Sequence, residues 1–135
     1  MSSNTVPNSL KVWFFIHFLV DIAFAIPLFL FPHAFLKFFN WQVIDPFTSR
    51  LVAAALFGIG IESYLGRNAS LESIKNILNL KVIWSAAAVI GIFVTIAQDF
   101  SNLLFIQLFI LIVFLVFNII WVNYRVVVAR QLTDQ

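Results

Sequence analysis

Four long runs of mostly apolar residues dominate this sequence. They cover residues 12–31, 47–65, 77–97 and 103–124, and the third run is expected to begin as early as Leu71. A helix that crosses the hydrocarbon core of a bilayer needs about 20 such residues. The four runs therefore predict an all-α integral membrane protein, with one transmembrane domain over residues 1–135.

The composition supports lipid rather than water as the main solvent. Apolar residues make up 62% of the 135 residues, and charged residues make up 10%. Soluble domains are about 45–50% apolar and about 25% charged, and a chain this short has little interior in which to hide the excess. The connecting segments are short, so we expect an up-down-up-down four-helix bundle. The net charge of +2 and the scattered basic residues do not indicate a nucleic-acid partner.

Signals at the ends of the runs fix where the helices are expected to begin. Asp45-Pro46 combines a good N-cap residue with proline at the first helical position. Ser70 is the expected cap of the third helix, and Glu72 in its first turn suits the helix dipole.

Other signals concern helix ends and helix contacts. Ser101 or Asn102 is expected to cap the fourth helix, Gly66 to end the second, and Pro27 to bend the first. Small residues four positions apart, which permit close helix contact, recur in the second and third runs: Ala54 and Gly58, Ala87 and Gly91.

The distribution of lysine and arginine predicts the orientation. If both termini are cytoplasmic, six of these residues lie inside: Lys11, Arg67, Lys75, Lys81, Arg125 and Arg130. Lys37 and Arg50 then lie outside. Because cytoplasmic segments carry the excess of positive charge, both termini are expected inside. The aromatic segment 31–41 is then on the outer face, and it is expected to lie in the membrane interface.

Five ionisable side chains interrupt the apolar runs. They are His17, Asp21, Arg50, Glu62 and Lys81. An ionised side chain at the centre of a bilayer costs about 2.5–3.5 kcal/mol on insertion scales, so each is expected to have a partner or a function.

Depth in the bilayer suggests how these side chains pair. Glu62 and Lys81 both lie about 9 Å to the inside of the centres of their runs, which predicts a structural ion pair. Asp21 lies near the midplane, and His17 is one helical turn before it on the same face, where it can donate to the Asp21 carboxylate. Arg50 is the expected cation for Asp21, with Lys81 as the alternative.

Polar residues also form stripes on the third and fourth runs, which are expected to point at the bundle interior. The stripes are Lys81, Ser85, Ala88 and Thr95 on the third run, and Gln107, Asn118 and Arg125 on the fourth. A ligand pocket inside the bundle would use five side chains from the runs: His17, Asp21, Arg50, Gln107 and Asn118.

No motif in the sequence carries a known chemistry. The chain lacks H-E-x-x-H, a phosphate-binding loop, G-x-S-x-G and a dinucleotide fingerprint. It has no cysteine, and its two histidines, His17 and His33, have no clear third ligand, so we expect no metal, no cofactor and no catalytic residues.

Three functions agree with these features. We expect first a non-enzymatic accessory or scaffold protein whose partners are the bilayer and either another membrane protein or further copies of the chain. The alternatives are a binder or enzyme for a lipid-like ligand in the pocket, and a small proton-coupled transporter that uses Asp21.

The stretches "WQVIDPFTSRLVAAA" and "LFGIGIESYLGRN", residues 41–68, resemble a group of small bacterial four-helix membrane proteins of the DoxX-like and BphX-like kind. The resemblance implies a four-helix bundle, and a bacterial inner membrane is the expected location. It carries over no catalytic or binding residue. The redox partnership of some DoxX-like proteins is not expected here, because the chain has no cysteine.

Overall fold

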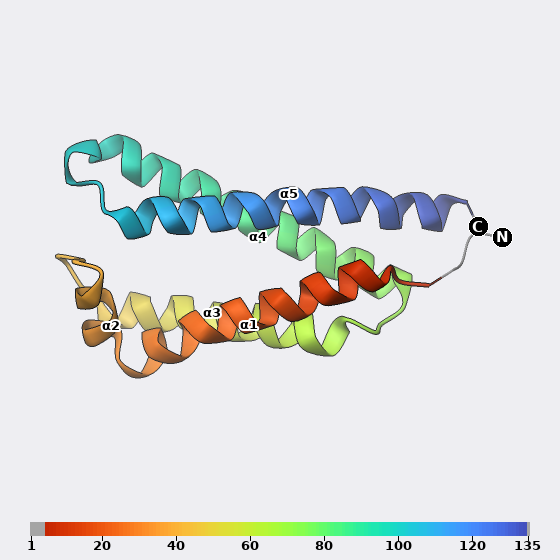
Figure 1. Cartoon of the computed structure of the whole chain (residues 1–135), viewed down its shortest axis with the longest axis horizontal. Coiled ribbons are helices and arrows are strands. Elements are labelled where there is room, and N and C mark those ends of the chain that lie inside the picture. Colours follow the sequence, from red (N-terminus) through yellow and green to blue (C-terminus); the bar gives the residue numbers. More distant parts are fainter. Residues whose placement is uncertain (1–4, 135) are drawn as a thin grey trace. The chain divides into compact units, whose positions relative to one another are not determined.

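The computed structural model describes residues 5–134, and every regular element in that range is a helix. Five α-helices and one short 3-10 helix follow one another: α1 (Asn8–Leu30), α2 (Pro32–Phe38), α3 (Pro46–Gly66), α4 (Leu71–Gln98), η1 (Phe100–Asn102) and α5 (Phe105–Thr133). The predicted all-α class is thereby confirmed (Figure 1).

The helices form two compact units, and we describe each by itself. The first covers residues 7–69. In it, α1 and α3 run side by side, and the short helix α2 is part of the connection between them (Figure 1). The second begins at Ser70, and its helices α4 and α5 run side by side (Figure 1). Each unit is a helical hairpin, which we call the α1–α3 hairpin and the α4–α5 hairpin.

Three helices in residues 5–134 are long and apolar enough to cross a membrane, namely α1, α4 and α5. The expectation from the sequence was four. The helix α3 is present and has 21 residues, about 31 Å, which is sufficient length. Its apolar character is diluted by Arg50, Glu62 and several small polar residues, so composition alone does not mark it as a span.

The predicted helix starts are confirmed at two positions. The Asp45 carboxylate accepts hydrogen bonds from the backbone N–H groups of Phe47 at 3.0 Å and Thr48 at 3.3 Å, with Pro46 at the first helical position. Ser70 Oγ accepts from the N–H of Ser73 at 3.3 Å, and α4 begins at Leu71.

The predicted cap of the last helix is wrong. The side chains of Ser101 and Asn102 donate to Asp99 Oδ1, so these residues close the preceding turn. The helix α5 begins after Leu104, whose N–H donates to Gln107 Oε1 at 3.0 Å. It also runs to Thr133, well beyond the predicted end at residue 124, because no proline or glycine interrupts its last segment.

The helix α1 continues through Pro27 and ends at Leu30, one turn later. The backbone N–H of Phe31 donates to the Pro27 carbonyl at 2.9 Å and closes this last turn. Because proline sits so near the end, its missing N–H removes one hydrogen bond without breaking the helix.

The buried residues of α1 and α3 differ in size. On α1 they recur every three or four positions: Leu10, Phe14, His17, Asp21, Ala25 and Leu28. On α3 they are all small: Ser49, Ala53, Gly60, Ser63 and Gly66. A face of small residues lets the larger side chains of a neighbouring helix come close to its backbone.

The cap of α3 predicts a specific pH dependence. The hydroxyl of Thr48 and the N–H of Phe47 donate to the exposed Asp45 carboxylate and hold its pKa below the ordinary value of 3.8. A lowered folded-state pKa stabilises the protein above the unfolded pKa, and this contribution is lost as the pH falls through the folded pKa. Asparagine at position 45 can cap the helix but does not titrate. We therefore expect Asp45→Asn to lack the fall in unfolding free energy that the titration of Asp45 causes between about pH 5 and pH 2. Unfolding in detergent at several pH values measures this difference. Equal pH profiles for both proteins would contradict the assignment.

Candidate functional site

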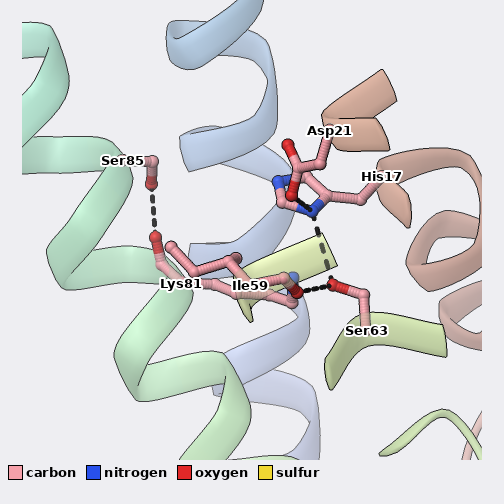
Figure 2. A network of polar contacts seen from close by, with 6 residues as sticks. All are labelled: His17, Asp21, Ile59, Ser63, Lys81 and Ser85. Atoms are coloured by element: carbon pink, nitrogen blue, oxygen red, sulfur yellow. Dashed lines mark hydrogen bonds and ion pairs between the residues drawn. The ribbon is translucent and has the colours of Figure 1, made fainter. Parts of the chain in front are cut away.

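A polar cluster lies between α1 and α3, in the middle of otherwise apolar helices. His17 and Asp21 come from successive turns of α1, and Ser63 comes from α3 (Figure 2). His17 Nδ1 lies 3.0 Å from Asp21 Oδ2 and 3.4 Å from Ser63 Oγ. His17 and Asp21 are both buried, with 7% and 6% of their surfaces exposed. The predicted contact between His17 and Asp21 is thereby confirmed.

The hydrogen bond of Ser63 to its own helix bears on the contact with the histidine. Ser63 Oγ donates to the carbonyl of Ile59 at 2.6 Å, so it can only accept from the histidine (Figure 2). The tautomer with the proton on Nδ1 is the one that suits this contact, because Ser63 Oγ then accepts from His17. Asp21 Oδ2 lies at ion-pair distance but without the alignment of a hydrogen bond.

The cluster contains the residue types of a hydrolase triad without its geometry. In a triad the aspartate and the serine contact opposite nitrogens of the histidine, and the serine gives its proton to the histidine. Here Asp21 and Ser63 contact the same nitrogen, and Ser63 gives its proton to its own helix. The arrangement links α1 to α3 through the contact between His17 and Ser63, and it differs from that of a triad.

Gly60 makes this arrangement possible. A Cβ atom built at Gly60 would stand 2.7 Å from Asp21 Cβ and 3.3 Å from Asp21 Oδ2. Real side chains do not approach so closely, so only glycine allows Asp21 to lie against the backbone of α3. Both Gly60 and Ser63 were missed in the sequence, although they continue the spacing of small residues that starts at Ser49 and Ala53.

The small residues chosen from the sequence do not make these contacts. A Cβ atom at Gly58 or at Gly91 would meet no atom within 4 Å. Their partners Ala54 and Ala87 are exposed as well. The four-residue spacing correctly indicates a shared face, but it does not show which face packs against a helix.

Arg50 does not pair with Asp21 in the α1–α3 hairpin. Its Nε donates to the backbone carbonyl of Phe29 at 3.2 Å. Phe29 lies in the last turn of α1, about 12 Å along the helix from Asp21. Carbonyls in the last turn have no partner in their own helix, and a cation is favourable there. Arg50 therefore stabilises the end of α1.

The α4–α5 hairpin has its own series of polar contacts. Asn118 Nδ2 donates to the carbonyl of Val82 at 3.2 Å and to Ser85 Oγ at 2.9 Å. Trp121 lies one turn further along α5. The Nζ atom of Lys81, on α4, lies 4.9 Å from the centroid of its ring. A cation over an indole ring is held by the negative face of that ring.

Two further contacts belong to this hairpin. Arg125 Nε donates to Asn79 Oδ1, and Ser85 Oγ donates to the carbonyl of Lys81 at 2.6 Å (Figure 2). Asn118 and Arg125 thus face α4, as two members of the predicted stripe on α5. The stripe on α4 ends early, because Thr95 is exposed and donates to Gly91 of its own helix.

The five residues expected to line a pocket do not converge within either hairpin. His17 and Asp21 lie together, whereas Arg50 binds the end of α1. Gln107 closes the first turn of α5, about 16 Å along that helix from Asn118. Within residues 5–134, no three His, Asp or Glu side chains are gathered as a metal site.

Two of the expected ion pairs join residues of different hairpins, so they stay predictions. These are Glu62 with Lys81, and Asp21 with Lys81. Within the hairpins, Glu62 is exposed on α3, and Lys81 is buried on α4.

Comparison with known proteins gives no relative, because the chain matches no family model, no curated protein and no solved structure. The function must therefore be inferred from the chemistry of the two hairpins.

Proposed function

We propose that this chain is a non-enzymatic accessory or scaffold protein that acts through contacts within a membrane. The observation that carries the proposal is the contact between Gly60 and Asp21. A methyl group added at Gly60 would not fit beside Asp21. The cluster of His17, Asp21 and Ser63 is therefore closely packed on the side that faces α3. On the side that faces α3, the carboxylate is therefore closed to a substrate.

The other polar side chains support the same function. Asn118 and Arg125 bind groups of α4, Lys81 lies over Trp121, and Arg50 binds the end of α1. Each of these side chains joins the two helices of its own hairpin. Polar contacts of this kind average about 0.6 kcal/mol in membrane proteins, and several together fix how two helices are aligned.

The membrane topology is part of the proposal. Besides α1, α4 and α5, we propose that α3 also crosses the bilayer, which completes a four-helix bundle. The length of α3 suffices, and Arg50 lies at the level where α1 ends, close to the expected interface. Both termini are proposed to be cytoplasmic, in a bacterial inner membrane, on the charge distribution and the resemblance to DoxX-like and BphX-like proteins.

Purification from native membranes in a mild detergent tests the proposed role. We expect a protein partner in a fixed ratio, or a defined homo-oligomer, that survives a second affinity step. The conservative variant Ser63→Ala should retain the same assembly, because a scaffold does not need a nucleophile. A monodisperse protein without partners that carries one small molecule per chain would contradict the proposal.

A proton-coupled transporter is the second candidate, because His17 and Asp21 are two titratable groups in contact near the middle of α1. Uptake by proteoliposomes that depends on a pH gradient, and that Asp21→Asn abolishes, would favour transport over a scaffold. A lipid-like ligand enclosed between the helices is favoured by no contact of the described residues.

A further inference from the structure

At the end of α3, an arginine lies over an aromatic ring. The guanidinium carbon of Arg67 lies 3.9 Å from the ring centroid of Tyr64, which is one turn earlier on α3. The Tyr64 ring lies 5.0 Å from the ring of Phe18 and 6.3 Å from that of Phe15, both on α1. Three rings of the α1–α3 hairpin thus form a platform with a cation on its surface, which we call the Arg67 platform.

One nitrogen of this arginine has no hydrogen-bond partner. Arg67 Nη1 is buried, and no group within residues 5–134 accepts a hydrogen bond from it. The N–H groups of a guanidinium lie in its plane, at its edge, so a ring below the plane leaves them to bind other groups. A buried charged donor without an acceptor is costly, so a rotation of this half-buried side chain that brings Nη1 to an acceptor outside the chain is favourable.

We propose that the Arg67 platform binds the phosphate of an anionic phospholipid in the cytoplasmic leaflet. The proposal rests on the membrane topology proposed above, which places the end of α3 at the level of the inner headgroups. A phosphodiester offers two oxygens to the planar edge of a guanidinium, the arrangement in which arginine binds phosphate most strongly.

The rings of the platform suit the rest of such a lipid. Tyr64 and Phe15 have 39% and 42% of their surfaces exposed, so they can contact a ligand from outside the hairpin. Aromatic side chains are favoured at the depth where the glycerol backbone and the first acyl carbons lie. A lipid therefore meets both parts of the platform, whereas a free phosphate ion meets only the arginine.

Native mass spectrometry of delipidated protein in detergent tests the proposal. The probes are phosphatidylglycerol, diacylglycerol with the same acyl chains, and inorganic phosphate. We expect the wild type to retain phosphatidylglycerol but not diacylglycerol. Arg67→Gln should weaken retention about tenfold, the usual scale for one charge-assisted phosphate contact. Arg67→Lys should retain an intermediate amount, because lysine keeps the charge without the planar edge.

The matched control is Arg130→Gln, which removes an exposed arginine in the last turn of α5. It should leave lipid retention unchanged. Equal retention by Arg67→Gln and the wild type would overturn the site, and so would an equal loss in Arg130→Gln. Inorganic phosphate that displaces the lipid at similar concentration would show that a free anion is the ligand. If Arg67→Gln does not fold, retention by Arg67→Lys equal to that of the wild type is the overturning result.

A failure of the topology would look different from a failure of the site. A chain that leaves the membrane in alkaline carbonate would contradict the proposed insertion, whatever lipid it binds. A chain that stays in the membrane, but binds phosphatidylglycerol equally with and without Arg67, would contradict only the lipid site.

Discussion

His17→Leu is expected to lower the free energy of unfolding by about 1–3 kcal/mol, the usual cost of leaving a buried polar group without its partner. The reason is that Asp21 stays buried against Gly60 and loses the imidazole that lies 3.0 Å from its carboxylate in the α1–α3 hairpin. Asp21→Asn has nearly the same shape without the charge. The double variant His17→Leu/Asp21→Asn should therefore recover most of the loss.

Unfolding in mixed micelles, followed by circular dichroism over an SDS titration, measures these changes. The control is Thr95→Val, which removes a hydroxyl that is exposed and bonded only to its own helix, and which should change stability by less than about 0.5 kcal/mol. Additive effects of the two substitutions would show that His17 does not stabilise the carboxylate.

The second large effect is expected from Gly60→Ala, which should destabilise the α1–α3 hairpin by about 1–3 kcal/mol. The added methyl group would stand 2.7 Å from Asp21 Cβ, an atom next to the α1 backbone, so the two helices must move apart. Helix propensity acts in the other direction, because alanine is favoured over glycine by about 1 kcal/mol in a helix. A net loss therefore requires the close contact.

Gly58→Ala is the matched control, since it lies on the same helix and its Cβ would meet nothing within 4 Å. It should be neutral or stabilise the protein by up to about 1 kcal/mol. The same SDS titration serves for both variants. A Gly60→Ala protein as stable as Gly58→Ala would contradict the close approach of α1 and α3.

Local signals in the sequence located most of the helices. Asp45-Pro46 and Ser70 mark real helix starts, because capping depends on residues next to one another in the chain. The cap of α5 was missed since Ser101 and Asn102 have a nearer acceptor in Asp99, and side chains of this type readily bond to neighbouring groups.

The contacts between helices were harder to predict. Depth along a helix follows from counting residues, but rotation about its axis depends on how both faces pack. For this reason His17 and Asp21, which share one helix, were paired correctly, whereas Arg50 was assigned to the wrong acceptor. Gly58 and Gly60 are two positions apart, and only packing shows that Gly60 faces α1.

Labelling of single cysteines in intact cells tests most directly whether all four long helices cross the membrane. The chain has no cysteine, so each introduced residue is read without background. Gln42 lies between α2 and α3, Asn68 between α3 and α4, and Ser101 between α4 and α5.

With four spans and cytoplasmic termini, Gln42→Cys and Ser101→Cys should react with a membrane-impermeant maleimide in intact cells. Asn68→Cys should react only after the cells are opened. Reaction of Gln42→Cys and Asn68→Cys from the same side would show that α3 does not cross, and would contradict the four-helix membrane bundle.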